Sequence, residues 1–220
     1  MNIPQIFVSS LLIAGLSYSV SAGTVLEYTF DTTTDGVTQN GQFQTFGQAT
    51  ASTSEGVLQG RLNSSSPFDA QISLNPGTLT LGGGETWDTI EFRIRQLADN
   101  TGTPGAPQAI DYASTLLSVT LSVGGFQNLG LFNTTYYTEV TQADGWSLFT
   151  VDLATYLVDN SFAANAEITS SRFDPIGSPA QAGNWVEVDY IAFNSVPEHG
   201  TYALLGGLIA LGFVAIKRRQ

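Results

Sequence analysis

Carboxylates and guanidinium groups carry nearly all of the acid–base and ionic chemistry open to this chain. Its only histidine is His199, close to the C-terminus, and it has no cysteine. A Ser-His-Asp or Cys-His relay therefore lacks its base, and a zinc site of histidine or thiolate ligands lacks its donors. What remains is a set of 19 Asp and Glu residues beside seven Lys and Arg residues.

Two carboxylates are the minimum that most glycoside hydrolysis requires, because one acts as the acid and the other as base or nucleophile. The stretch Glu187-Val188-Asp189 resembles the Glu-x-Asp-x-Glu strand of laminarinase-like jelly-roll hydrolases. The resemblance ends at Ile191, where that family has its second glutamate. We therefore expect no catalysis, and we keep a carboxylate glycoside hydrolase as the less favoured alternative.

Binding without catalysis is the chemistry that residues 87–97 favour. Alternation along this segment predicts that Ile90, Phe92 and Ile94 face one way and a second set faces the other. That second set combines an aromatic ring with guanidinium and carboxylate groups that can grip a sugar, although a cross-strand ion pair is the structural alternative. Two tyrosines after a turn at Asn133 offer a further aromatic platform. The candidate glycan-binding residues are Trp87, Glu91, Arg93, Arg95, Tyr136 and Tyr137.

The charge of the chain limits its partners. Its net charge is −12, and residues 23–195 alone hold 18 acids, four arginines and no lysine, a balance of −14. Nucleic acid and anionic lipid need clustered positive charge, so neither is expected to bind this region. Neutral glycans and divalent cations are compatible with it, and an acidic surface also keeps an exported protein soluble.

Short strands separated by turns are predicted throughout residues 23–195, with at most one short helical turn at 162–166 and a polar loop at 98–113. Several strands alternate apolar and polar residues, which is typical of two antiparallel sheets packed face to face. We expect Trp146 and Trp185 to cap the core of this single domain. The nine predicted strands are 24–30, 56–62, 68–74, 87–97, 115–123, 135–141, 146–153, 168–173 and 185–193.

The strand at 115–123 alternates most strictly. Its serine and threonine residues, Ser118, Thr120 and Ser122, would add hydroxyl groups to the candidate glycan site if this strand neighbours 87–97. The residues predicted to face inward are Leu117, Val119, Leu121 and Val123.

A resemblance to known domains covers most of 23–195. The segments YTFDTTTDG, GVLQGRL, SPFDAQISL, TIEFRIRQL, GWSLFTVDL, SRFDPIGSP and VEVDYIAF follow an order similar to jelly-roll domains of the galactose-binding-like, carbohydrate-binding-module type. The resemblance implies an all-β jelly roll that binds glycans, often with a structural calcium ion joining the first and last strands. The matching positions are Glu27, Asp31 and Asp189, with Asp69 as an outside candidate. Turn capping without a metal is the alternative for these acids.

Both ends of the chain have the composition of targeting segments. Residues 6–20 are largely apolar, and small residues precede a cleavage point after Ala22, which predicts a signal peptide at 1–22, with a permanent anchor as the alternative. At the other end, Val196-Pro197-Glu198 is followed by an apolar run at 202–216 and by three basic residues at 217–219.

This C-terminal order resembles a PEP-CTERM sorting signal. The resemblance implies a membrane helix at 202–216 and recognition near Val196, Pro197 and Glu198 by an exosortase-type transpeptidase. His199 stands where that family usually has a second proline, which bears on cleavage more than on membrane targeting.

The predicted protein is an exported, non-catalytic β-sandwich delivered to the cell surface or extracellular matrix. Its expected partners are extracellular polysaccharide, the sorting transpeptidase and, through the C-terminal helix, the membrane. The alternative is a structural matrix component without a small ligand.

Overall fold

The computed structural model describes residues 22–50, 56–63, 70–109, 116–129, 135–176 and 183–197. Of the predicted signal peptide only Ala22 is described, and Glu198 and the predicted membrane helix at 202–216 lie outside the described residues. Val196 and Pro197 end the last strand of the domain. Among the described residues, no helix is long and apolar enough to cross a membrane.

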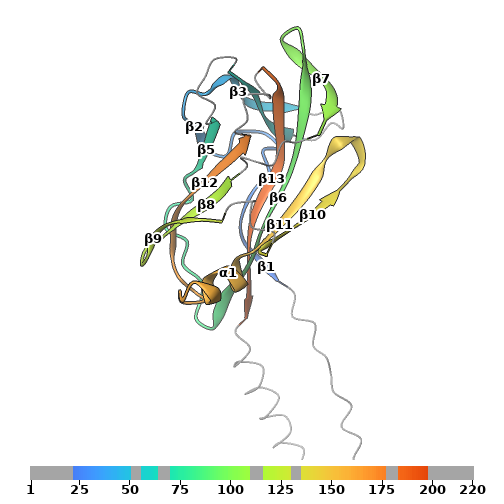
Figure 1. The fold of residues 1–220 in the computed structure, drawn as a ribbon. Helices are drawn as coiled ribbons and strands as arrows, with labels where there is room; N and C mark the ends of the chain where they lie inside the picture. The colour runs from blue at the N-terminus through green and yellow to red at the C-terminus, as the bar shows by residue number, and fades with distance from the viewer. Residues whose placement is uncertain are drawn as a thin grey trace, which may run out of the picture.

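Two antiparallel β-sheets lie face to face, which confirms the predicted sandwich (Figure 1). The larger sheet consists, in spatial order, of β10 (Tyr137–Thr141), β11 (Ser147–Asp152), β6 (Glu85–Asn100), β13 (Trp185–Pro197), β4 (Gly56–Leu62) and β3 (Phe43–Thr50), with β1 (Gly23–Tyr28) on β13 and β7 (Thr103–Gln108) on β6. The smaller sheet consists of β2 (Thr38–Gln39), β5 (Ala70–Leu74), β12 (Ile168–Ile176), β8 (Leu116–Leu121) and β9 (Gly125–Asn128).

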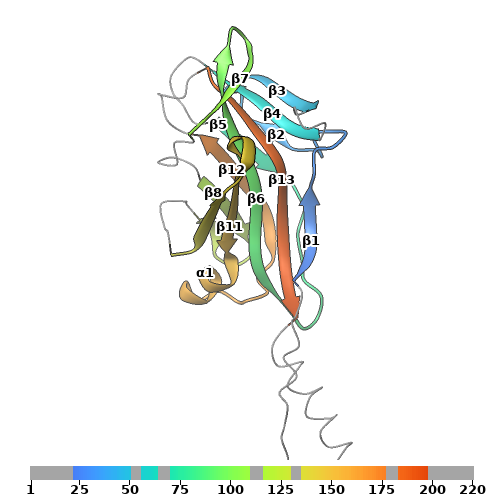
Figure 2. The same cartoon turned by 90° about the vertical axis from the view of Figure 1, so that its right-hand side faces the viewer.

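Two long strands, β6 and β13, pair along the centre of the larger sheet (Figure 2). Each changes its second partner partway along. β13 pairs with β4 through Val188 and with β1 from Ile191 onward. β6 pairs with β11 up to Ile94 and with β7 from Gln96 onward. The centre of the sheet is therefore continuous, and it is flanked by β4 and β7 at one end and by β1 and β11 at the other.

All nine predicted strands are present, and four strands were missed: β2, β3, β7 and β9. β7 was predicted as part of a loop because it contains Pro104 and Pro107, which cannot donate to a ladder. It pairs with β6 alone, and an edge strand tolerates proline because its outer side needs no partner. β3 lies at the other edge of the larger sheet, where Gly47 interrupts its apolar pattern.

The core fills the space between the sheets and follows the predicted alternation closely. Ile90, Phe92 and Ile94 from β6 are buried there, as expected. The ring of Phe92 lies 5.0 Å from that of Phe149 in the same sheet and 4.8 Å from that of Phe173 in the opposite sheet. Aromatic side chains therefore join the two layers directly, at centroid distances that are favourable for ring pairs.

Val123 is not part of the core, contrary to the prediction. β8 ends at Leu121, and Val123 lies in the following turn with 77% of its surface exposed. The alternation of 115–123 continued in sequence past the point at which the strand ends.

Trp87 faces the core rather than the outer surface, which corrects its predicted orientation. Ile90 pairs with Phe193 and Trp87 pairs with Ser195, so β6 has two intervening residues where β13 has one. This β-bulge reverses the alternation of β6 between positions 87 and 90. Trp87 is consequently 0% exposed, and its indole N–H donates to the Ala166 carbonyl at 2.7 Å.

The only described α-helix is α1 (Leu153–Asp159), and the predicted helical turn at 162–166 does not form one. The Asp152 carboxylate accepts from the Thr155 N–H at 2.8 Å and so caps the first turn. Leu153, Tyr156 and Leu157 turn one face of this short helix toward the core. Figure 1 shows α1 at the end of the sandwich opposite to β7.

Candidate functional site

The candidate site starts from three polar side chains that lie in one row across the outer face of the larger sheet. Glu187 on β13 is paired in register with Arg95 on β6 and with Gln59 on β4. Arg95 Nε donates to Glu187 Oε2 at 2.6 Å, and Gln59 Nε2 donates to Glu187 Oε1 at 2.7 Å. Arg95 and Glu187 are only 4% and 2% exposed. Their geometry is therefore fixed by mutual charge-assisted hydrogen bonds in a setting with little water.

A second ion pair lies beside this row. Arg93 NH1 donates to Asp189 Oδ2 at 2.8 Å, and Arg93 Nε donates to the side-chain oxygen of Gln142 at 2.8 Å. Asp189 is an extra residue between the Val188–Ile94 and Tyr190–Arg93 pairs, so β13 bulges there. The bulge lies where β13 changes partner, and it places the carboxylate beside Arg93.

Trp146 covers both arginines. Their Cζ atoms lie 4.6 Å (Arg93) and 4.5 Å (Arg95) from the centroid of its ring, which is favourable cation–π geometry. Trp146 is 2% exposed and packs with Val57 in a small cluster separate from the main core. The prediction that Trp146 caps the core is therefore wrong, because this ring covers the outer face of the larger sheet.

Trp185 also lies outside the main core. It is paired with Leu97 and Arg61, two positions along from the row of Glu187, so its side chain shares that outer face. Its indole N–H donates to Asp99 Oδ1 at 3.0 Å, and Arg61 NH2 lies 2.7 Å from Asp99 Oδ2. The hydrogen bond from Trp185, opposed by desolvation and aided by Gly102 and Arg61, lowers the pKa of Asp99.

Two hairpins border the row and form a groove above it. One is β6–β7, and the other joins β10 to β11 through the short 3₁₀ turn η2 (Ala143–Gly145); Figure 1 shows both on the same side of the sandwich. Gly145 has φ +76°, and a Cβ there would collide with the Pro107 ring. Glycine therefore allows the two hairpins to approach each other.

The hairpin groove, as we call it, is a hollow of about 410 Å³ lined by Gln59, Arg95, Leu97, Pro104, Gly105, Pro107, Asp144 and Glu187. Another hollow, of about 350 Å³, is lined by Pro107, Gln108, Ala109, Glu139, Thr141, Gly145 and Ser147. Glu139 is in register with Phe149 and Ser147 with Ile94, so this second hollow lies on the inner side of the larger sheet and is not part of the groove. Volumes of this size are in the range of small-molecule sites.

The predicted glycan-binding residues separate into three places. Glu91, Arg93 and Arg95 lie on the outer face of the larger sheet as predicted, whereas Trp87 lies in the core. Tyr136 and Tyr137 lie beside a different hollow of about 340 Å³ near α1, together with Asp88, Thr89, Thr135, Thr138, Thr150 and Asp152.

Both tyrosines make contacts within the domain. Tyr136 donates to Asp159 Oδ2 at 3.1 Å and meets the Tyr156 ring edge-on, while Tyr137 packs against Phe149. In the same hollow, desolvation first and the Asp152 carboxylate second raise the pKa of Asp88.

Ser118, Thr120 and Ser122 do not join the predicted site. β8 belongs to the smaller sheet, where Ser118 pairs with Arg172 and Thr120 pairs with Ser170. These hydroxyl groups therefore lie on the opposite side of the sandwich from Arg93 and Arg95, and Ser122 lies in the turn after β8.

The hydrolase-like motif has two carboxylates, and both are engaged in ion pairs. Glu187 is held by Arg95 and Gln59, and Asp189 by Arg93. Ile191, which occupies the position of the second glutamate, is buried in the main core. A carboxylate at that position of the strand would thus point away from the groove.

The predicted calcium ligands are not gathered in the described part of the chain. Glu27 and Asp31 are exposed, and Asp189 Oδ2 is bound to Arg93. No group of three or more His, Cys, Asp or Glu side chains suited to a metal occurs among the described residues, and Asp69 lies outside them. Calcium stays a prediction, tested by melting the protein with and without EDTA, since a bound ion raises apparent stability by mass action.

Several groove residues were missed by sequence reasoning. Gln59 could have been predicted from the sequence, because alternation in GVLQGRL places Gln59 and Arg61 on the face opposite to Leu58 and Leu62. The sequence could not predict that Asp144, Pro104 and Pro107 line the groove, because their positions depend on how two hairpins approach each other. The pairing of Arg95 with Glu187 was likewise hidden, since 92 residues separate them.

The fold and this groove define the class of the chain as an antiparallel β-sandwich domain with a polar groove on one outer face. No protein-family model matches the sequence, and no curated protein matches it.

Among solved structures, the chain is similar to the CBM22-1–GH10 modules of the Clostridium thermocellum N-terminal endo-1,4-β-D-xylanase 10B, crystallised with xylohexaose. The identity is 14% and the TM-score 0.38, over 80% of this chain and 28% of the xylanase chain. The chain thus spans less than a third of that protein, and similarity at this level carries no conclusion about function.

Proposed function

We propose that residues 23–195 form a non-catalytic domain that binds neutral polysaccharide through the hairpin groove. The observation that carries the proposal is the fixed row of Gln59, Glu187 and Arg95 along one wall of the groove. Arg95 and Glu187 are buried, so they act by holding Gln59. The groups that meet sugar hydroxyls are Gln59 and the exposed Asp144. A polar group that is already oriented loses little entropy on binding.

The apolar part of the lining suits the less polar faces of a sugar ring. It consists of Leu97, two residues beyond Arg95 on β6, and of Pro104 and Pro107 from β7. Within the row the charges of Arg95 and Glu187 cancel, so an uncharged ligand is favoured over an ionic one. The groove is open at the surface, which is compatible with a polymer.

Delivery to the cell surface or matrix belongs to the same proposal and rests on the terminal sequences alone. The signal peptide at 1–22 directs export, and the segment at 196–220 engages the membrane and an exosortase-type transpeptidase. Fractionation of cells that express the full chain tests this. Recovery of the uncleaved protein in the cytosol would refute it.

Affinity gel electrophoresis against neutral polysaccharides tests the binding function. We expect Gln59→Ala and Asp144→Asn to reduce retention, and Gln44→Ala, an exposed position outside the groove, to leave it unchanged. Because Gln59→Ala removes a partner of buried Glu187, each variant is melted in parallel to show that it is folded. Absence of retention together with concentration-dependent self-association would favour the structural matrix component instead.

A further inference from the structure

The outer face of the smaller sheet carries a second arrangement of residues with sugar-binding chemistry. Arg172 on β12 is paired in register with Ser73 on β5 and with Ser118 on β8. In the adjacent row, Thr120 on β8 is paired with Ser170 on β12 and with Phe126 on β9. Register alone therefore brings hydroxyl groups, one guanidinium group and one aromatic ring together on four neighbouring strands.

Phe126 is the aromatic surface of this face. It is 56% exposed, and the Arg172 Cζ atom lies 5.5 Å from the centroid of its ring. Arg172 NH2 also donates to Asp174 Oδ2 at 2.7 Å, and Asp174 is buried. The buried carboxylate thus orients the guanidinium group, and the guanidinium group lies against the ring, which stays open to solvent.

A hollow of about 240 Å³ lies beside this ring. The charges of Arg172 and Asp174 cancel, and the rest of the lining is uncharged. Arg172 Nε has no hydrogen-bond acceptor among the described residues. The lining, which we call the Phe126 hollow, consists of Ser73, Asn75, Ser118, Thr120, Phe126, Ser170, Ser171 and Arg172.

We propose that the Phe126 hollow is a second glycan-binding site, which takes one unit of a neutral polysaccharide. The apolar face of a sugar ring stacks on Phe126, and its hydroxyl groups bind Arg172 and the serine and threonine hydroxyls. The volume lies below the roughly 300–1,000 Å³ of sites for larger ligands, which limits the contact to about one sugar unit.

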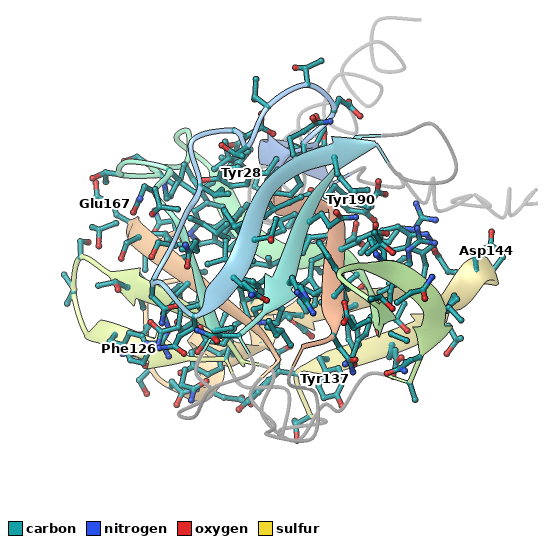
Figure 3. The ribbon with its side chains drawn as sticks, turned by 90° about the horizontal axis from the view of Figure 1, so that it is seen from above. Tyr28, Phe126, Tyr137, Asp144, Glu167 and Tyr190 are labelled. Atoms are coloured by element: carbon teal, nitrogen blue, oxygen red, sulfur yellow. The ribbon has the colours of Figure 1, made fainter. Side chains whose placement is uncertain are left out.

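The consequence is a domain with two sites that face away from each other. Figure 3 shows Phe126 and Asp144, which belong to the two sites, on opposite sides of the molecule with the sheets between them. One molecule can then hold two polysaccharide chains and link them, a role that neither site performs alone. This inference does not depend on the hairpin groove for its chemistry, and the two sites fail separately.

The test uses the purified full-length protein and soluble xylan, β-glucan, galactomannan and dextran as probes in affinity gels. In a Gln59→Ala background, we expect Phe126→Ala to weaken the remaining retention about tenfold. Val123→Ala, in the same hairpin but outside the hollow, is the matched control and should change nothing. Both substitutions are at exposed positions, so melting midpoints should stay within about 2 °C of the parent.

Linking is measured by turbidity when protein and polysaccharide are mixed. Wild type should produce turbidity, and Gln59→Ala and Phe126→Ala alone should each bind polysaccharide without producing it.

Each outcome separates the two proposals. If Gln59→Ala alone abolishes retention, or if Phe126→Ala changes nothing in that background, the second site is refuted while the hairpin groove stands. If Phe126→Ala alone abolishes retention and Gln59→Ala has no effect, the second site stands and the groove is refuted. If no probe is retained by the folded wild type, both proposals are refuted.

Discussion

The two outer faces of the sandwich both carry polar side chains, but they differ in how far these side chains are covered. On the larger sheet Arg93 and Arg95 are paired with carboxylates and covered by Trp146, and the Arg95–Glu187 pair is almost fully buried. On the smaller sheet the polar groups are mostly hydroxyls, and the aromatic ring, Phe126, is open to solvent.

The difference lies in what covers each face. The β6–β7 hairpin and η2 reach over the larger sheet, whereas the described residues provide no such cover above Phe126. Burial makes ion pairs rigid but costs desolvation, so the covered face is sensitive to the loss of a single partner. On the open face, the loss of a single partner is therefore expected to cost less stability.

The largest expected contrast is between the aromatic rings of the two faces. Trp146→Ala empties a buried position and should lower the free energy of unfolding by about 3–5 kcal/mol. Phe126→Ala should change it by less than about 1 kcal/mol, because the ring is already exposed. Urea denaturation with unchanged m-values measures both. Equal losses would show that the two faces do not differ in this way.

The second contrast concerns the ion pairs. Glu187→Gln leaves the buried Arg95 charge uncompensated and should cost about 3 kcal/mol, while replacing both residues, as Arg95→Met with Glu187→Leu, should restore much of that loss. Asp174→Asn on the smaller sheet should cost roughly 1 kcal/mol, since the Arg172 side chain is a third exposed and solvent screens its charge. A double-mutant cycle gives the coupling energies. A larger coupling energy for Arg172–Asp174 than for Arg95–Glu187 would contradict the comparison.

A smaller effect is expected from acid on the covered face. The folded-state pKa of Asp99 lies below its usual value near 3.8, chiefly because Trp185 donates to it. This contribution to stability is therefore complete above the usual pKa and is lost as the pH falls through the folded-state pKa. Asp99→Asn should flatten that part of the stability profile between about pH 5 and pH 3. An unchanged acid profile in the variant would exclude the contribution.

The smallest effect is expected at Asp88, which lines the hollow beside Tyr136 and Tyr137. Desolvation and Asp152 raise its pKa, so its ionisation above the usual pKa opposes folding. Asp88→Asn should therefore raise the free energy of unfolding at pH 7 by less than about 1 kcal/mol and have no effect at acid pH. A destabilised variant at pH 7 would show that the charged form is needed.

Much of the fold could be predicted because alternation reports burial directly. The strands at 87–97 and 56–62 are examples in which inward and outward residues differ clearly in polarity. α1 was missed although its sequence carries a signal: Asp152 as a cap, then Leu153, Tyr156 and Leu157 at helical spacing. Because this helix has only seven residues, its apolar spacing is too short to be distinguished from a continuation of the preceding strand.

The candidate site was harder to predict from the sequence, for two physical reasons. A bulge adds one residue without any change in composition, so alternation assigned Trp87 to the wrong face. Strand pairing joins residues far apart in sequence, so neither the partner of Arg95 nor the sheet that holds Thr120 was readable. Alternation placed Arg93 and Arg95 on the outer face correctly, because the bulge of β6 lies before Ile90 and the alternation after it is regular.

The pairing of Gly23 with Ser195 brings the first and last strands of the domain together at one end, as Figure 1 also shows, with β7 at the other end. A force that pulls these two positions apart would act across the β1–β13 ladder and break its hydrogen bonds one after another. Alternatively, the force could act between one of these two positions and a polymer bound in the hairpin groove. This force would be directed along β6 and β13. The domain should therefore yield easily to the first direction of pulling and resist the second.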